Sequence, residues 1–148
     1  IDNMITNHPD IDRINGKTIK PDVYFKKLNQ LFDYIEKNKN LKVVIAAHPK
    51  SDYATEFNNR KLIKYKTNEL VKHSSLVIAH HSNAIYFAIL HYKPLLLVYS
   101  NEFLNDRNVI PVLNNIYHSI ALYRYILDAG IVNLDELDEI RLKEVDVK

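Results

Sequence analysis

Short apolar runs without internal alternation constrain the fold of this chain more than any other feature. Three of them, 41–47, 76–79 and 95–99, are almost wholly aliphatic, and a weaker fourth run covers 62–65. Half-exposed strands alternate polar and apolar residues, whereas strands buried on both faces read as continuous apolar runs. The stretches between the runs have helical spacing. The sequence therefore predicts an α/β fold, with a mainly parallel sheet of about four strands covered by helices on both faces.

The longest predicted helix covers 23–38 and is capped by Asp22, with apolar residues spaced along one face. Four further helices are predicted from caps and spacing: 68–73 after Thr67, 83–92 after Ser82, 109–129 closed by Gly130, and 134–148. Residues 1–21 are polar and contain two prolines and a glycine, so they are predicted to form a linker. The domain itself is then expected to span residues 22–148.

Composition excludes several classes of function. The chain has 148 residues, no cysteine and a net charge of +2, which is too small to indicate binding to nucleic acid or to an anionic membrane. No apolar run approaches the roughly 18–20 residues of a transmembrane helix. We therefore expect a soluble domain in the cytoplasm, either free or at the inner face of the membrane. The chain starts at Ile1 without an initiator methionine, so we expect it to be part of a longer protein.

Common cofactor motifs are absent from the sequence. Gly16 and Gly130 are the only glycines, so neither a dinucleotide-binding glycine motif nor a P-loop is present. There is no His-x-x-x-His or His-Glu-x-x-His pair, and no cysteine to bind zinc. We expect no metal and no bound cofactor.

Polar residues instead gather directly after the apolar runs. The predicted strands are followed in turn by His48-Pro49-Lys50, Lys66-Thr67, His80-His81-Ser82-Asn83 and Ser100-Asn101-Glu102. If the strands are parallel, all four groups lie at one edge of the sheet, which is where ligands bind in open α/β folds.

The residue types at this edge suit an anion. Ser82 is a good N-cap, and we expect the backbone N–H groups of residues 83–85 to be available to a phosphate. Thr67 is a second helix start of this kind, and His48 and Lys50 supply further donors. Each feature also has a purely structural interpretation, as a cap, a turn or a buried histidine. It is their predicted convergence that favours a binding site.

A family resemblance rests on the runs 44–50, 66–70, 75–84 and 93–95. Together they resemble the C-terminal half of bacterial surface-polysaccharide glycosyltransferases, which have the GT-B architecture of two Rossmann-like domains. They are also similar to the related halves of capsule polymerases, bacterial sialyltransferases and CDP-glycerol glycerophosphotransferases. The resemblance implies a Rossmann-like three-layer domain that binds a nucleotide-activated sugar donor.

The resemblance also implies roles for individual residues. His48 matches the His of a His-Pro motif that contacts the donor phosphate or nucleotide, Ser82 and Asn83 match a phosphate-binding turn, and Thr67 starts a helix beside the same cleft. Lys50 and His80 are included in this predicted nucleotide- and phosphate-binding set. Many relatives carry an acid after the phosphate turn to hold the ribose, but residues 85–87 are apolar here. Glu102 is a candidate replacement, and CMP- or CDP-linked donors are as plausible as UDP-linked ones.

The acceptor domain, which would supply the catalytic base and bind the carbohydrate acceptor, is expected upstream. Asp2 is then a remnant of the end of the preceding strand, and the fragment is expected to transfer nothing alone. Two alternatives stay open. One is a different enzyme built on a similar half, either a sugar-nucleotide epimerase or a glycerophosphotransferase. The other is a non-catalytic α/β regulatory module.

Overall fold

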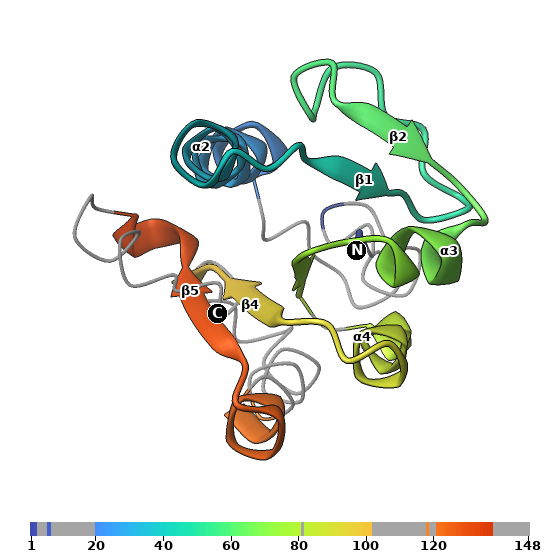
Figure 1. The fold of residues 1–148 in the computed structure, drawn as a ribbon. Helices are drawn as coiled ribbons and strands as arrows, with labels where there is room; N and C mark the ends of the chain where they lie inside the picture. The colour runs from blue at the N-terminus through green and yellow to red at the C-terminus, as the bar shows by residue number, and fades with distance from the viewer. Residues whose placement is uncertain (3–5, 7–19, 81, 102–117, 119–120, 138–148) are drawn as a thin grey trace.

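The computed structural model describes residues 1–2, 6, 20–80, 82–101, 118 and 121–137. It confirms the predicted α/β class with parallel strands (Figure 1). The strands form a two-stranded sheet of order β1-β2 and a three-stranded sheet of order β3-β4-β5, and every pair is parallel. Their bounds are β1 Val44–Ala46, β2 Lys61–Ile63, β3 Val77–Ala79, β4 Leu95–Tyr99 and β5 Gly130–Asn133.

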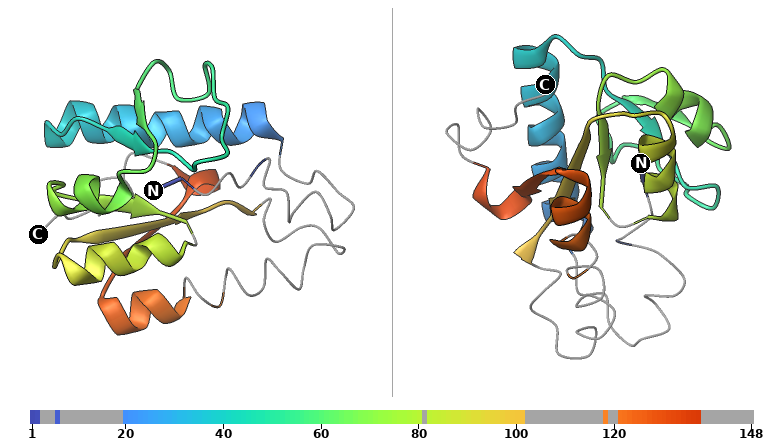
Figure 2. Two further views of the ribbon diagram at one scale, coloured as in Figure 1. Left: turned by 90° about the vertical axis from the view of Figure 1, so that its right-hand side faces the viewer. Right: turned by 60° about the horizontal axis from the view of Figure 1, so that its bottom comes forward.

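Helices cover both faces of the strands, which gives three layers (Figures 1 and 2). The helix α2, Pro21–Lys39, lies on one face. The other face carries α3 (Thr67–Lys72), the 3₁₀ turn η1 (Asn83–Ile85) with α4 (Tyr86–Leu90), and a helical segment at 121–127. None of the helices in these described segments is long and apolar enough to cross a bilayer.

The start of α2 differs from the prediction. The helix begins at Pro21, with Lys20 as N-cap and no side-chain capping bond, so the predicted Asp22 cap is wrong. Proline suits the first helical position because the N–H that it lacks would have no helical partner there. The helix ends where Asn40 adopts a left-handed φ of 52°.

The core lies between α2 and the strands. β4 is its centre, and its residues Leu97 and Val98 are fully buried. The apolar face of α2 packs toward it, through Tyr24, Phe25, Leu28, Leu31, Phe32 and Ile35. β4 has the bounds that the sequence predicted, because a continuous apolar run of five residues fits the middle of such a sheet.

A fifth strand, which the sequence did not predict, lies between two predicted helices. The helical segment stops at residue 127, Asp128 turns the chain with a left-handed φ of 48°, and Gly130 begins β5 beside β4. Gly130 was predicted to be a helix cap, and that prediction is wrong. A Cβ at this position would lie 2.9 Å from Cδ1 of Leu96, so the absence of a side chain lets β5 approach β4. The 3₁₀ turn η3, Leu134–Glu136, then occupies the start of the last predicted helix, of which 138–148 lie outside the described residues.

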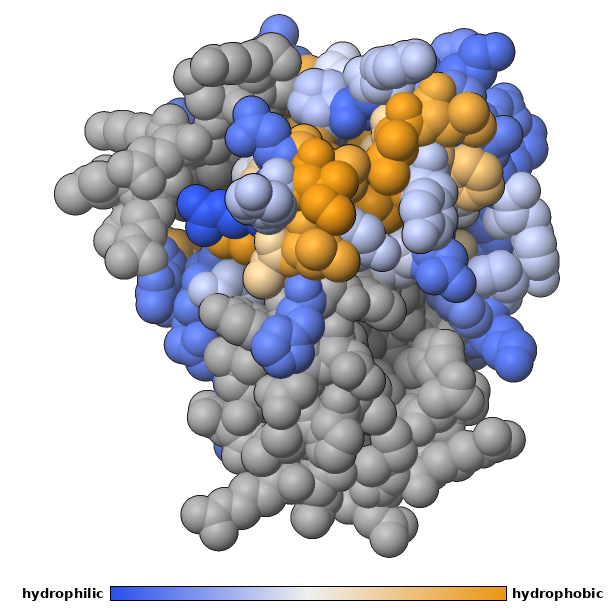
Figure 3. Space-filling model, turned by 90° about the horizontal axis from the view of Figure 1, so that it is seen from below, coloured by the Kyte–Doolittle hydropathy of each residue, from blue (hydrophilic) through white to orange (hydrophobic). Residues whose placement is uncertain are grey.

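The outer face around α4 and the 121–127 segment is partly apolar. Figure 3 views the molecule from this side and shows apolar residues gathered in a patch with hydrophilic residues around it. The exposed aliphatic residues of these two segments are Ile89, Leu90, Leu122 and Ile126.

The first two residues lie between the two sheets. The Ile1 nitrogen donates a hydrogen bond to the carbonyl of Ile78 in β3, and the Asp2 amide donates to the carbonyl of Ala46 in β1 at 3.0 Å. These two residues therefore pack between the sheets, whereas the sequence had predicted a linker over residues 1–21. Most of the predicted linker, 3–5 and 7–19, lies outside the described residues.

Candidate functional site

The turns after β1 and β3 lie at the same edge of the molecule, on either side of Ile1 and Asp2. The backbone amide of His48, just past β1, donates to Oδ2 of Asp2 at 3.1 Å. Ile1 is bonded to Ile78, two residues before His80. β1, β3 and β4 run in one direction (Figure 2, left), so this edge is formed by the carboxyl ends of the strands. The end of β1 and the end of β3 are thus bonded to two consecutive residues, Asp2 and Ile1.

His48 is held in a tight turn. Its carbonyl accepts bonds from both the amide and the hydroxyl of Ser51, at 3.0 and 2.7 Å. Its ring Nδ1 accepts a bond from the Lys50 amide at 3.2 Å, so the turn orients the imidazole. The Lys50 side chain is exposed at this edge. Both residues are therefore placed where a ligand could reach them.

Asp2 brings a negative charge to the centre of the edge. Its Oδ1 accepts a hydrogen bond from the Tyr53 hydroxyl at 3.0 Å, while Oδ2 accepts from the His48 amide. Burial, and then the Asp2 charge, raise the pKa of Tyr53 well above its ordinary value, so the phenol stays protonated. A phosphate at this edge must avoid the carboxylate, whereas a sugar hydroxyl can donate to it.

His80 lies inside the protein at this edge. It is 6% exposed, and its Nε2 forms a hydrogen bond with the Tyr24 hydroxyl. Burial, together with the nearby Ile1 ammonium, lowers the pKa of His80 to about 3. The ring is therefore neutral at physiological pH and packs behind the edge. The predicted set of phosphate-binding groups loses a cationic contact at this position.

Ser82 is an N-cap, as predicted, but most of the donors behind it are used. Its Oγ accepts from the Ala84 amide at 3.2 Å, and its carbonyl accepts from the Ile85 amide at 3.0 Å. The expectation that all three amides of 83–85 are available is therefore wrong for two of them. The first turn is a 3₁₀ turn, whose i→i+3 bond closes on Ser82 itself. Asn83, the first residue of this turn, is exposed.

Thr67 does not cap α3 as the sequence predicted. Thr67 is the first residue of α3, and Lys66 occupies the N-cap position without a side-chain cap bond, so the predicted Thr67 cap is wrong. Lys66 pairs instead with Glu69 at 3.6 Å. Glu102 lies outside the described residues, as does His81.

A polar cluster centred on Asp135, just beyond β5, was missed in the sequence. The Asp135 carboxylate accepts bonds from Lys27, from the Ser100 hydroxyl at 2.7 Å and from the Asn101 amide at 2.5 Å. Burial alone would raise the Asp135 pKa, but the hydrogen bonds from Lys27, Ser100 and Asn101 outweigh it and lower this pKa. The cluster joins α2 to the ends of β4 and β5. The available signal was an acid just past a strand, which was hidden because no strand was predicted at 130–133 and Asp135 was placed in a helix.

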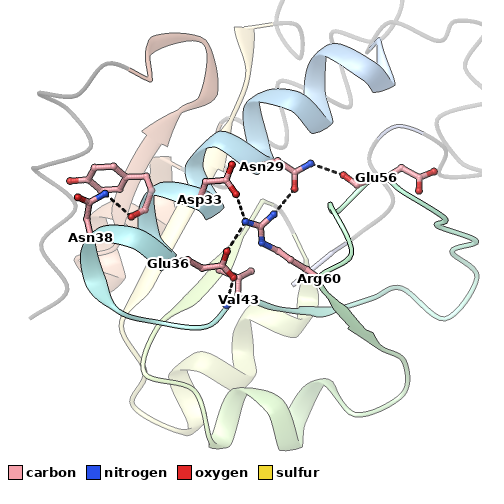
Figure 4. A network of polar contacts seen from close by, with 8 residues as sticks. Asn29, Asp33, Glu36, Asn38, Val43, Glu56 and Arg60 are labelled. Carbon is pink, nitrogen blue, oxygen red and sulfur yellow. Dashed lines mark hydrogen bonds and ion pairs between the residues drawn. The ribbon is translucent and has the colours of Figure 1, made fainter.

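Arg60, the residue just before β2, is the centre of a second polar network (Figure 4). Its guanidinium donates to Asn29 at 2.9 Å, to Asp33 at 2.5 Å and to Glu36 at 2.7 Å, all on α2. Because Arg60 stands at the amino end of β2, this network lies away from the carboxyl edge. Its role is to fix the loop before β2 against α2.

A cavity of about 410 Å³ lies between β1 and β3. We call it the slot. Asp2, Tyr53 and His80 line it from the carboxyl edge, and α2 and α3 line it from the two faces.

Within the described residues, no three His, Asp or Glu side chains come together as they would around a metal ion. Comparison with protein-family models, with curated proteins and with solved structures finds no match for this chain.

Proposed function

We propose that this chain is the donor-binding domain of a glycosyltransferase that builds cell-surface polysaccharide, and that it binds the nucleotide of an activated sugar at the carboxyl edge. One observation carries the proposal. The His48 turn and the Ser82 turn flank Ile1 and Asp2 at the ends of parallel strands. Open α/β sheets bind ligands in this position.

The donor phosphates would contact the His48 ring, the Lys50 ammonium and the Asn83 side chain. Charge-assisted bonds of this kind contribute about 1.5–3 kcal/mol each. The same contacts would stabilise the charge that develops on the departing nucleotide phosphate. Asp2 would accept a bond from a sugar or ribose hydroxyl, since its carboxylate repels the phosphates. The base that deprotonates the acceptor would come from outside this chain.

Either cytosine or uracil is compatible with this site as the base of the nucleotide. The segment after the Ser82 turn contains Ile85 and Phe87, and no acid that could hold a ribose in the way many UDP-sugar enzymes do. A CMP- or CDP-linked donor therefore fits at least as well as a UDP-linked one.

The test is a titration of the ¹⁵N-labelled chain with CMP, CDP, UDP and inorganic phosphate, followed by NMR. We expect shifts at His48, Lys50 and Asn83 with a cytidine nucleotide, at millimolar affinity or tighter. His48→Ala should weaken binding by about tenfold, the equivalent of one charge-assisted bond. His73→Ala is the matched control, because His73 is an exposed histidine at the C-terminal end of α3, away from this edge.

Preferential binding of UDP would favour either the epimerase alternative or a UDP-sugar enzyme. No shift with any nucleotide or with phosphate would refute donor binding and leave the regulatory-module interpretation. Unfolding of His48→Ala, with His73→Ala intact, would show that the His48 turn has a structural role only.

A further inference from the structure

The slot is shaped by two strand edges and two helices. β1 and β3 face one another across it, and apolar side chains close it above and below. The helix α2 supplies Leu28, Phe32 and Ile35, and α3 supplies Leu70 and Val71. A peptide in the slot would thus be buried on both faces and must be apolar on both.

The backbone of both strands presents hydrogen-bonding groups to the slot. In β1, the Ala47 amide bonds to Ile63 of β2, so the alternation of a strand turns the N–H and C=O of Ala46 and Val44 toward the slot. In β3, the Val77 amide bonds to Pro94 just before β4, so the N–H and C=O of Ile78 face the slot in the same way.

Ile1 and Asp2 are bonded as the last residues of a strand between these edges would be. The Ile1 nitrogen bonds to β3 on one side, and the next amide, that of Asp2, bonds to β1 on the other. This alternation is the pattern of a central strand. Figure 2 (left) shows the two residues running in the direction of β3 and β4.

We propose that the slot binds one further strand, an extended apolar peptide segment that is joined to Ile1 and runs parallel to β1 and β3. The added strand unites the two small sheets into one sheet of order β2-β1-added-β3-β4-β5.

The parallel ladder assigns its hydrogen bonds. In such a ladder, a residue donates to one partner and accepts from the residue two positions further along. The residue immediately before Ile1 then donates to the Val44 carbonyl and accepts from the Ala46 amide. The residue before that accepts from the Ile78 amide. These bonds continue the two that Ile1 and Asp2 already make.

The environment of the Ile1 nitrogen supports this assignment. Burial lowers the pKa of the Ile1 ammonium to about 6, although the Asp2 charge opposes the shift. A peptide bond at Ile1 removes the buried charge and keeps the N–H that donates to Ile78. The site therefore suits an amide better than an ammonium.

The helices support it independently. α2 lies on one face of the strands, whereas α3 and α4 lie on the other. With the added strand counted first along the chain, the order becomes 3-2-1-4-5-6, that of a doubly wound sheet. In that fold the helices change faces where the order reverses, beside the first strand. The reversal then falls at the slot, directly behind Asp2 and His80.

The experiment compares three chains: the chain as it stands, the chain with Val-Ile-Val-Val placed before Ile1, and the same extension ending in proline, Val-Ile-Val-Pro. Proline next to Ile1 lacks the N–H that must donate to Val44. Hydrogen exchange of the Ala46 and Ile78 amides and the melting temperature are measured. With Val-Ile-Val-Val, we expect both amides to exchange about tenfold more slowly or better, and Tm to rise by about 5 °C or more. The proline version should keep less than half of either gain.

Unchanged exchange at Ala46 and Ile78 in the extended chain, or equal protection by the proline version, would overturn the proposal. So would a dimer of the unextended chain in which both amides are already protected, because a second copy would then fill the slot. A readout on the unextended chain guards against a misfolded extension. There the Ala46 and Ile78 amides should exchange about tenfold faster than that of Leu97 in β4, and equal rates would contradict an empty slot.

Discussion

The buried histidine at the carboxyl edge should make the protein sensitive to mild acid. His80 packs against Tyr24 from α2, with the Ile1 ammonium and the Asp2 carboxylate nearby. Its pKa is about 3 in the folded protein and 6.5 in an ordinary environment. The unfolded chain therefore binds the proton more readily. The stabilisation that comes from keeping this ring neutral is complete above pH 6.5 and declines as the pH falls toward 3.

The size of the effect follows from these two pKa values. Between pH 7.5 and pH 5, the free energy of unfolding should fall by about 2 kcal/mol through His80 alone. The Ile1 ammonium, with a pKa lowered from 8.0 to about 6, adds a loss of the same sign at higher pH. The contribution of His80 must therefore be taken from a difference between variants.

The assay is urea unfolding of the unaltered protein and of His80→Gln at pH 7.5, 6 and 5. Glutamine does not titrate and can still bond to the Tyr24 hydroxyl. We expect the gap between the two proteins to close, or to reverse, by about 2 kcal/mol on going to pH 5. The exposed His73→Gln serves as control and should follow the unaltered protein. The reasoning is refuted if His80→Gln shows the same pH dependence as the unaltered protein, or if the His80 ring protons titrate near pH 6.5 in NMR spectra.

Three further predictions concern the contacts that position the strands. Arg60→Met should lower the free energy of unfolding by about 1–3 kcal/mol in urea melts because it removes three bonds to α2, whereas a matched change at the exposed neighbour, Lys61→Met, should stay within about 0.5 kcal/mol. Gly130→Ala should cost about 1–3 kcal/mol through its contact with Leu96, and an unchanged melting curve would mean that β5 lies farther away. Asp135→Asn should cost about 1–3 kcal/mol at pH 7, and the difference from the unaltered protein should shrink as the pH falls below 3.8 through the lowered Asp135 pKa; a constant difference would argue against a charged bond to Lys27.

Composition and periodicity predicted the class of fold because parallel strands that are buried on both faces are continuous apolar runs in the sequence. The run at 95–99 could become only a central strand, and it did so with the bounds predicted. β5 was not predicted, since Gly130 was interpreted as the cap of the preceding helix. It is a strand because Gly130 can approach Leu96, and that contact is tertiary. The start of α2 was also mispredicted. The sequence favoured Asp22 as the cap, but the helix begins at the rigid Pro21.

The candidate site shows the same division. Its location at the ends of β1 and β3 followed from strand direction alone. The burial of His80 and the bonding of the amides after Ser82 could not be predicted. Both depend on packing, through the contact of His80 with Tyr24 and the 3₁₀ closure of the turn. Asp2 had little signal of its own, since its position depends on backbone bonds to residues far along the chain.

The outer strand β2 carries Lys61 on its exposed side, and Lys64 follows it closely. Charges on a short outer strand discourage another molecule from adding to the sheet and starting aggregation. The inner borders of β1 and β3 have no such guard, since Val44, Leu76 and Ile78 are all aliphatic. A short fused strand that covers these borders should therefore protect recombinant material better than any change at the outer strand β2.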